Sequence, residues 1–296
     1  MMPAMLRILL ILLMLATAWP ARAAIVVGSK IDTEGALLGN MILLLLNRHG
    51  IEATGKLQLG PTQIVRRALI SGEIDIYPEY TGNGAFFFGP ESDPVWRDAD
   101  KGYARVKELD RAKNHLVWLE PAPANNTWAI AVRRDLKLGT LQEFARYVDG
   151  GGTVRLAASA EFANSPGGLP SFEKTYGLTL TRRQLVTLAG GNTAATIRAA
   201  AEHISGVNAG MAYGTDGALS VLGLVALADD KGAQVVYRPA PVAREAVVTA
   251  HPEVASILDP VFATLTLQKL QSLNAKIAVE GLDARAVAAD YLRSLK

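Results

Sequence analysis

The residues of this sequence best suited to chemistry are aromatic side chains placed where the chain turns or crosses. Tyr77, Tyr80, Trp128, Tyr213 and Tyr237 fall at such positions, although aromatic residues make up only 6% of the chain. For any single tyrosine, core packing is the commoner role. The set is better explained by a shared ligand, because a box of rings attracts a methylated cation by roughly 0.5–2 kcal/mol per ring. We therefore expect a pocket for a trimethylammonium compound.

Polar residues near these rings predict how such a guest is oriented. Lys30 could pair with a carboxylate, and Asn83 and Asn126 could hydrogen-bond to it. Thr215 and Asp216 could fix the loop that they share. Two of these residues have ordinary alternatives, since Lys30 could be a solvated surface lysine and Asp216 a structural cap.

Signatures of catalysis and of metal binding are missing from the sequence. The chain has no cysteine, its glycine-rich stretches lack the spacing of a nucleotide-binding loop, and no serine stands in a nucleophile motif. The histidines are scattered and never fall at ligand spacing. A hydrolase or lyase using Glu79 or Asp216 as its base stays an alternative, although neither carboxylate has a catalytic partner. We expect a binding protein with no catalytic residue, metal or cofactor.

Strand and helix patterns alternate along the chain, which predicts an α/β protein. Two similar units each bring a tyrosine, Tyr80 or Tyr213, to a loop at the end of a strand. Ligands bind beyond the carboxyl ends of parallel strands, so both loops should face one crevice. The expected elements are strands at 24–27, 74–76, 127–132 and 234–237, and helices at 37–46, 63–71 with Thr62 as N-cap, 141–147 and 194–203.

Two crossing points divide the chain into two lobes. The strand-like segment 127–132 leaves the first lobe, and 234–237 returns to it through the extended, proline-rich residues 238–241. Amphipathic stretches at 254–274 and 284–295 should pack onto the first lobe as helices. We therefore expect mainly parallel sheets, with residues 24–126 and 238–296 in the first lobe and 127–237 in the second.

The N-terminus has the pattern of a cleavable signal peptide. Arg7 supplies a positive charge, residues 8–19 an apolar core, and Ala21-Arg22-Ala23 a cleavage site, so the mature chain begins near Ala24. An uncleaved anchor is the alternative, but the apolar run is shorter than the roughly 20 residues that a spanning helix needs. Cleavage leaves 28 basic and 28 acidic residues, which argues against nucleic acid. We expect a monomer in the periplasm.

At these residues the chain resembles the substrate-binding proteins of osmoprotectant ABC importers, the glycine betaine, choline and carnitine uptake family. The likeness covers nearly the whole mature sequence, and its most specific part is the block Asp75-Ile76-Tyr77-Pro78-Glu79-Tyr80-Thr81-Gly82. The resemblance implies a two-lobed type II periplasmic binding protein with a two-strand hinge. It also implies a cage round a quaternary ammonium, formed by Tyr80, Trp128, Tyr213 and Tyr237. The other matching segments are Gly28-Ser29-Lys30 with Thr33-Glu34, Asn125-Asn126-Thr127-Trp128, Glu161-Phe162-Ala163, Tyr213-Gly214-Thr215-Asp216, and Tyr237 with Pro239 and Pro241.

The chain departs from this family where the other end of the ligand would bind. Ser165 stands where members often carry an arginine that clamps a carboxylate, Asn83 replaces a threonine, and Asn126 and Trp128 replace Asp or Tyr. Loss of a charged hydrogen-bond partner weakens recognition by about 1.5–3 kcal/mol. The resemblance thus implies a weakly binding component that delivers a quaternary-amine osmolyte to an inner-membrane permease with a cytoplasmic ATPase. A different zwitterion or cation, or a sensory module that presents ligand to a receptor, is the alternative.

Overall fold

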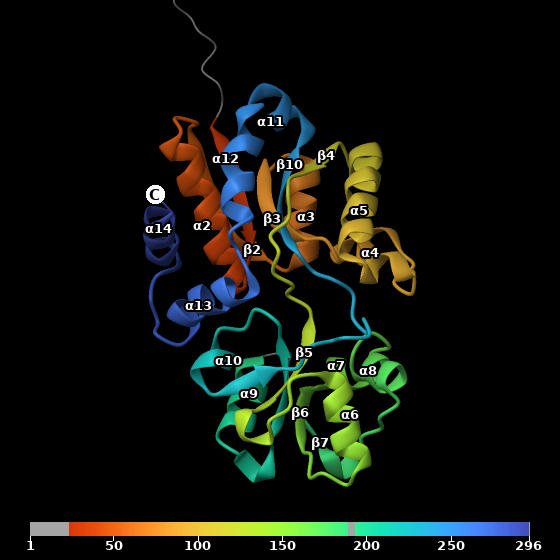
Figure 1. The fold of residues 1–296 in the computed structure, drawn as a ribbon. Helices are drawn as coiled ribbons and strands as arrows, with labels where there is room; N and C mark the ends of the chain where they lie inside the picture. Colours follow the sequence, from red (N-terminus) through yellow and green to blue (C-terminus); the bar gives the residue numbers. More distant parts are fainter. Residues whose placement is uncertain (1–23, 189–192, 296) are drawn as a thin grey trace, which may run out of the picture.

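The computed structural model describes residues 24–188 and 193–295, which form two lobes lying one above the other (Figure 1). Each lobe holds one sheet of five strands within these described ranges. The expected signal peptide at 1–23, and the glycines just before Thr193, lie outside the described residues. In the described part of the chain, no helix is both long enough and apolar enough to cross a membrane.

The sheet of the first lobe combines segments from both halves of the chain. Its strands are β1 (Ile25–Lys30), β2 (Ala53–Gly60), β3 (Ile76–Tyr80), β4 (Leu116–Trp118) and β10 (Pro239–Arg244). In the order β2-β1-β3-β10-β4, β1 is parallel to β2 and β3, whereas β10 runs antiparallel to β3 and β4. The helices of this lobe are α2 (Thr33–Arg48), α3 (Thr62–Ser71), α4 (Asn83–Phe88), α5 (Ala99–Asn114), α11 (Glu245–Ala250), α12 (Glu253–Phe262), α13 (Leu267–Ala278) and α14 (Ala284–Ser294), with a 3₁₀ turn at Pro94–Arg97.

The sheet of the second lobe repeats the same plan with a single stretch of chain. Its strands are β5 (Trp128–Arg133), β6 (Leu156–Ser159), β7 (Leu185–Leu188), β8 (Ala209–Tyr213) and β9 (Leu224–Ala226). In the order β7-β6-β8-β5-β9, β6 is parallel to β7 and β8, whereas β5 runs antiparallel to β8 and β9. The helices of this lobe are α6 (Leu141–Asp149), α7 (Ala160–Asn164), α8 (Leu169–Tyr176), α9 (Thr193–Ala201) and α10 (Ala218–Val221), with 3₁₀ turns at Arg134–Leu136, Arg182–Gln184 and Ile204–Gly206.

The expectation of mainly parallel sheets is confirmed for all strands except β10 and β5, each of which runs opposite to the other strands of its sheet. In each lobe the antiparallel strand is the one that arrives from the other lobe. β3 ends at the junction between the lobes and β10 begins there, so the two strands must run in opposite directions. The same holds for β8 and β5 in the second lobe.

Three local expectations also need correction. Tyr80 and Tyr213 are the last residues of β3 and β8 and do not lie on loops, and Pro61, not Thr62, is the N-cap of α3. Residues 234–237 form no β-strand, and the prolines that follow lie inside β10. The carbonyl oxygens of Pro239 and Pro241 accept hydrogen bonds from the segment that follows β4. The N–H that a proline lacks would point to this same side, so the two prolines remove no hydrogen bond from the pairing of β10 with β3.

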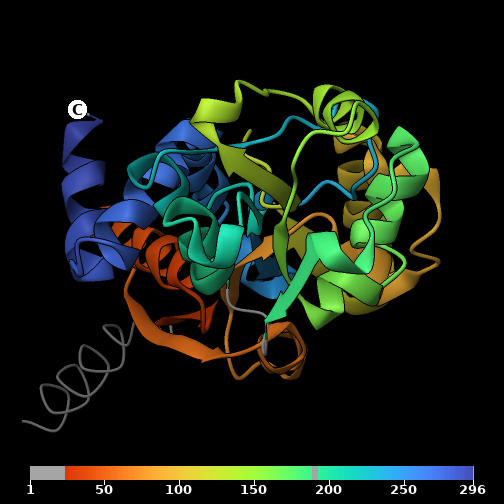
Figure 2. The ribbon, with the colours of Figure 1, turned by 90° about the horizontal axis from the view of Figure 1, so that it is seen from below.

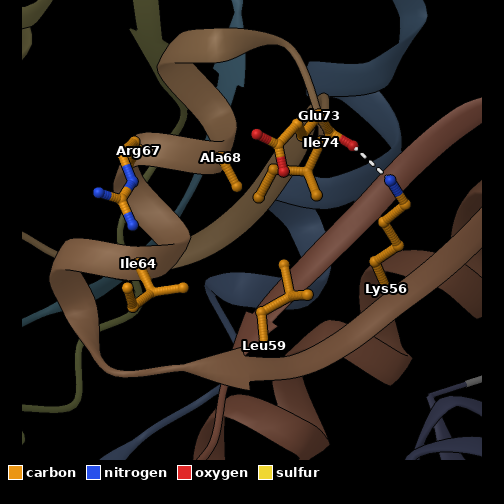
Figure 3. Close-up of a pocket in the computed structure, with 7 residues that line it drawn as sticks. All are labelled: Lys56, Leu59, Ile64, Arg67, Ala68, Glu73 and Ile74. Atoms are coloured by element: carbon orange, nitrogen blue, oxygen red, sulfur yellow. Dashed lines mark hydrogen bonds between the residues drawn. The ribbon is translucent and has the colours of Figure 1, made fainter.

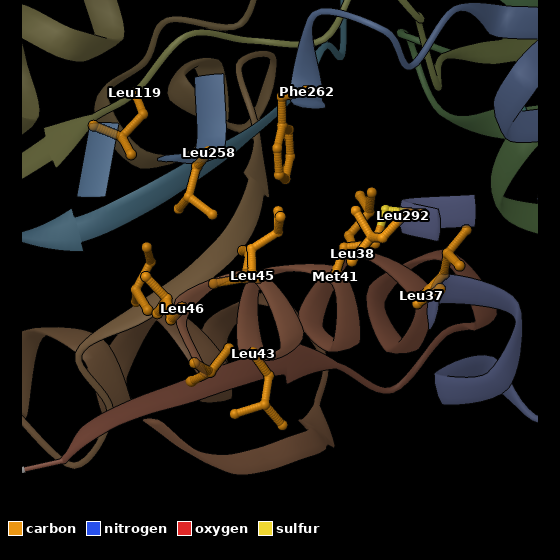
Figure 4. Packing of buried hydrophobic residues seen from close by; sticks show 14 of the residues in the cluster. Leu37, Leu38, Met41, Leu43, Leu45, Leu46, Leu119, Leu258, Phe262 and Leu292 are labelled. Carbon is orange, nitrogen blue, oxygen red and sulfur yellow. The ribbon is translucent and has the colours of Figure 1, made fainter. Parts of the chain in front are cut away.

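The main core packs the C-terminal helices onto α2, as the sequence predicts (Figure 4). Asp32 is the N-cap of α2, and its side chain accepts a hydrogen bond from Gly35 N at 2.7 Å. Most of its side chains are buried, because the sheet covers one side and α12, α13 and α14 cover the other. Both Figures 1 and 2 show α13 and α14 beside α2 at one edge of the molecule. Fully buried members of this core include Leu37, Leu38, Met41, Leu46, Leu258 and Phe262.

Two crossing segments run side by side between the lobes and form the expected two-strand hinge (Figure 1). Asn126 N donates to Tyr237 O at 2.9 Å, and Tyr237 N donates to Asn125 Oδ1 at 2.8 Å. Thr127 Oγ1 donates to Val235 O at 2.9 Å. The hinge therefore holds residues on either side of the crossing in fixed register.

Candidate ligand-binding site

The structure brings the four expected cage residues to the junction of the two lobes. Tyr80 ends β3, and Tyr213 ends β8. Trp128 begins β5 directly opposite Tyr213 in the β5–β8 pairing. Tyr237 lies on the returning hinge segment, where burial raises the pKa of its hydroxyl to about 12 and the neighbouring Tyr213 adds to the rise. These four residues thus come to the lobe junction from both lobes and from the hinge.

The start of α4 fixes the position of Tyr237. A Cβ on Gly82 would lie 2.7 Å from Cδ1 of the Tyr237 ring, so only glycine fits beneath the ring. Thr81 Oγ1 donates to Val236 O at 3.0 Å and accepts from Arg238 N at 3.1 Å. The threonine and glycine that follow Tyr80 in the sequence therefore clamp the returning hinge segment against the first lobe.

Lys30 lies at the site, but its ammonium group already has a partner. Lys30 Nζ is 2.5 Å from Glu79 Oε1, and both side chains are buried. Glu79 also accepts hydrogen bonds from Tyr77 Oη at 2.6 Å and from Asn83 Nδ2 at 2.7 Å. Lys30 Nζ further lies 4.6 Å from the centroid of the Tyr80 ring. The positive charge of Lys30 is thus balanced by Glu79, and Tyr77 supports this pair from the core.

Glu34 is the site residue that the residue-by-residue reading missed. Its carboxylate accepts from Tyr80 Oη at 2.8 Å, from Asn274 Nδ2 at 2.7 Å and from Asn126 Nδ2 at 3.3 Å. Burial is the main cause that raises the pKa of Glu34 to about 7, and the charge of Asp32 adds to it. The sequence signal was an acidic residue in the first turn of a helix that directly follows the first strand.

On the second lobe, the loop after Tyr213 is built as expected. Asp216 Oδ2 accepts from Tyr213 N at 2.7 Å, which makes Asp216 a structural cap of this loop. Burial raises the pKa of Asp216. Thr215 is buried, and its hydroxyl hydrogen-bonds to Glu34 of the first lobe. Both residues therefore help to set the position of the Tyr213 ring.

Polar atoms with unused hydrogen-bonding capacity lie on both sides of the crossing. Asn126 Oδ1 and Ser165 Oγ are buried and have no partner among the described residues. Ser165 caps the C-terminal end of α7, next to Phe162, whose ring meets Trp128 edge-to-face at 5.7 Å. Buried polar atoms are normally paired, so these two can still bond to a solute.

A separate pocket of about 380 Å³ lies away from these residues, on the first lobe between β2 and α3 (Figure 3). Lys56 crosses its edge and donates to Glu73 O at 3.2 Å. Its lining is partly apolar and contains none of the residues expected to bind ligand. Within residues 24–188 and 193–295, no group of histidines and carboxylates is arranged to hold a metal ion. The lining residues are Lys56, Leu59, Ile64, Arg67, Ala68, Glu73 and Ile74.

Comparison with known proteins identifies the family. Residues 23–294 match the family described as the substrate binding domain of ABC-type glycine betaine transport systems. The chain belongs to this family. It is 57% identical over 289 residues to the glycine betaine-binding protein YehZ of Escherichia coli, covering 96% of this chain and 95% of that protein. It is 34% identical over 277 residues to a glycine-betaine-binding protein of Pseudomonas aeruginosa, covering 90% and 86%.

Solved structures agree with this assignment. The structure of apo YehZ from Escherichia coli has 58% sequence identity and a TM-score of 0.85, covering 92% of this chain and 98% of that one. A glycine betaine/carnitine/choline ABC transporter structure shares the fold at 22% identity, with a TM-score of 0.79 and coverage of 91% and 98%. The protein is therefore the substrate-binding component of an ABC importer and not an enzyme. Its partners are a small solute and a membrane permease with its ATPase.

Proposed function

We propose that this protein binds a betaine-type quaternary amine between its lobes and delivers it to the permease from the periplasm. The observation that carries the proposal is that four aromatic residues, from both lobes and the hinge, lie at the lobe junction. Aromatic faces attract a methylated ammonium that cannot donate hydrogen bonds. The relatives named for glycine betaine binding support the same solute class. The cage residues are Tyr80, Trp128, Tyr213 and Tyr237.

The charges at the site favour the cationic end of the solute over a carboxylate end. Lys30 is paired with Glu79, and Ser165 stands where an arginine would clamp a carboxylate. A carboxylate would then depend on neutral groups, mainly Ser165 Oγ and the amide of Asn126. This composition supports weak binding of glycine betaine, and a different zwitterion or cation is the second candidate.

The remaining parts of the proposal concern the chain as a whole. We place the lobe boundaries at 126/127 and 237/238, because the hinge hydrogen bonds join these segments. Residues 1–23 act as a cleaved signal peptide that directs a monomer to the periplasm. Rotation about the hinge closes the lobes over the solute.

Calorimetric titration of the mature protein with glycine betaine, choline, carnitine and ectoine tests the solute class. At least one compound should give saturable heat, and Tyr213→Ala and Tyr237→Ala should abolish it. Tyr147→Ala is the matched control, because Tyr147 lies in α6 and contacts Thr153 outside the site. Absence of heat with all four compounds would exclude the solute class, and unchanged affinity in both site variants would exclude the cage.

A further inference from the structure

The carboxylate of Glu34 is buried at the lobe junction without a cation to balance it. Only 4% of the residue is exposed, and no lysine or arginine among the described residues forms an ion pair with it. Its partners are a phenol, a hydroxyl and two amides, from Tyr80, Thr215, Asn126 and Asn274. These residues come from β3, the loop after β8, the outgoing hinge segment and α13. One carboxylate thus joins four elements that meet at the site.

Such an arrangement lowers the stability of the fold. Burial of a lone carboxylate is unfavourable, and a neutral side chain of similar shape would stabilise the protein more. The cost is visible in the pKa of Glu34, which burial raises to about 7. Strongly perturbed carboxyl groups in a cleft are concentrated at functional sites. The placement of Glu34 next to Tyr80 therefore points to a role in binding.

Asn274 carries the connection from Glu34 into the second lobe. Its Nδ2 donates to Glu34 Oε2 at 2.7 Å and to Thr215 O at 3.0 Å. Gln271, one turn earlier on α13, donates to Gly214 O at 2.7 Å. A Cβ on Gly217 would lie 2.1 Å from Ala275 N, so the loop after Tyr213 packs directly on the backbone of α13. α13 belongs to the core of the first lobe, and it therefore braces the loop of the second.

We propose that Glu34 is the positioning residue of the site. It fixes the Tyr80 ring by accepting a hydrogen bond from its hydroxyl, and through Asn274 it fixes the loop that follows Tyr213. One carboxylate thereby sets the positions of Tyr80 in the first lobe and Tyr213 in the second. This inference rests on the proposed function, because it assigns a role within the proposed cage.

The negative charge of Glu34 also acts on a bound cation. The ionised carboxylate accepts the hydrogen bonds from these four side chains and attracts a quaternary ammonium. The protonated form is a weaker acceptor and carries no charge. The charged or titratable groups that face it are few. Asp32 and the hydroxyl of Tyr80 lie nearby, Lys30 is paired with Glu79, and α13 contributes only the neutral Gln271 and Asn274. Affinity for a cation should therefore rise as Glu34 loses its proton.

Glu34→Gln and Asn274→Ala test the proposal, with Asp110→Asn as the matched control. Asp110 is also buried in the first lobe, but it pairs with Arg66 away from the site. By titration with choline, both site variants should bind roughly tenfold more weakly than wild type, and the control should bind normally. Wild-type affinity should be roughly tenfold higher at about pH 8 than at about pH 6, and Glu34→Gln should show no such dependence.

Hydrogen–deuterium exchange provides a readout that needs no ligand. In Glu34→Gln and Asn274→Ala, the backbone amides of residues 213–217 should exchange faster than in wild type or Asp110→Asn. If wild type binds none of the solutes, the proposed function fails, and the exchange data alone decide whether Glu34 braces the loop. If wild type binds but Glu34→Gln keeps its affinity, pH dependence and protection, Glu34 is not a positioning residue.

Discussion

Replacement of Glu34 by glutamine should change the stability of the protein in a pH-dependent way. In the folded protein, burial raises the pKa of Glu34 from 4.5 to about 7. In the unfolded chain the carboxyl group is hydrated and keeps its ordinary pKa. Because the folded pKa is the higher one, the group favours folding fully below about pH 4.5, and this support is lost as pH rises toward 7.

The size of this effect follows from the two pKa values of Glu34. A rise from 4.5 to about 7 corresponds to about 3 kcal/mol of unfolding free energy lost above pH 7. Between pH 5 and pH 8 the loss is about 2–3 kcal/mol. Glutamine cannot ionise, so the stability difference between Glu34→Gln and wild type should shift by this amount in favour of the variant. The hydrogen bonds lost in the variant add a constant and do not alter the shift.

Urea denaturation of both proteins at several pH values between about 5 and 8 measures this shift. Tyr80→Phe is the control, because it keeps the carboxylate while removing one hydrogen bond that lowers the pKa of Glu34. This control should retain the pH dependence of wild type or enlarge it. Stability curves for Glu34→Gln and wild type that run parallel over this range would refute the argument.

Three further substitutions test other parts of the structure. Gly82→Ala would place a Cβ 2.7 Å from the Tyr237 ring, so calorimetry should show roughly tenfold weaker solute binding, whereas Gly139→Ala, which meets only the end of Glu143 at 3.6 Å, should bind normally. Asp110→Ala would leave the buried Arg66 and the indole of Trp118 without their partner, so urea denaturation should show a loss of about 3–5 kcal/mol; a loss below about 1 kcal/mol would contradict this. Leu258→Ala should cost about 2–5 kcal/mol because the side chain is fully buried, and Leu282→Ala, at 47% exposure, should cost less than about 1 kcal/mol; equal losses would place Leu258 outside the core.

The positions of the proposed cage residues were predictable from the sequence because Tyr80, Trp128 and Tyr213 lie at ends of segments that the sequence marks. Tyr80 follows a short alternating strand, and Tyr213 follows a similar one. The C-terminal helices were predictable from the periodicity of their apolar residues. These apolar faces pack against α2 in the structure. Local patterns therefore predicted where the aromatic residues lie and that the C-terminal helices pack onto the first lobe.

Strand direction and the role of Glu34 depend on distant contacts. β10 meets β3 after the chain has crossed to the second lobe and returned, and no local pattern states the direction in which it will run. The Glu34 carboxylate meets Asn274, which lies 240 residues further along the chain. Asn274 itself lies on an amphipathic helix, where the sequence gives no reason to distinguish it from a solvent-facing polar residue. Only the fold shows that these two residues share a hydrogen bond.

The two buried glutamates of the first lobe, Glu34 and Glu79, contribute differently to the charge of the site. Glu79 neutralises Lys30 and is held by Tyr77 and Asn83, so this group contributes little net charge. Glu34 forms no ion pair with a lysine or arginine of the described residues, so its charge is not balanced within the described part of the chain. A solute with a quaternary ammonium would supply the missing positive charge, and a free carboxylate on the same solute would meet no unpaired cation. The cationic end of the solute should therefore dominate recognition. Glu34 contributes to it twice, because its charge attracts the cation and its hydrogen bonds position the aromatic rings that bind the cation.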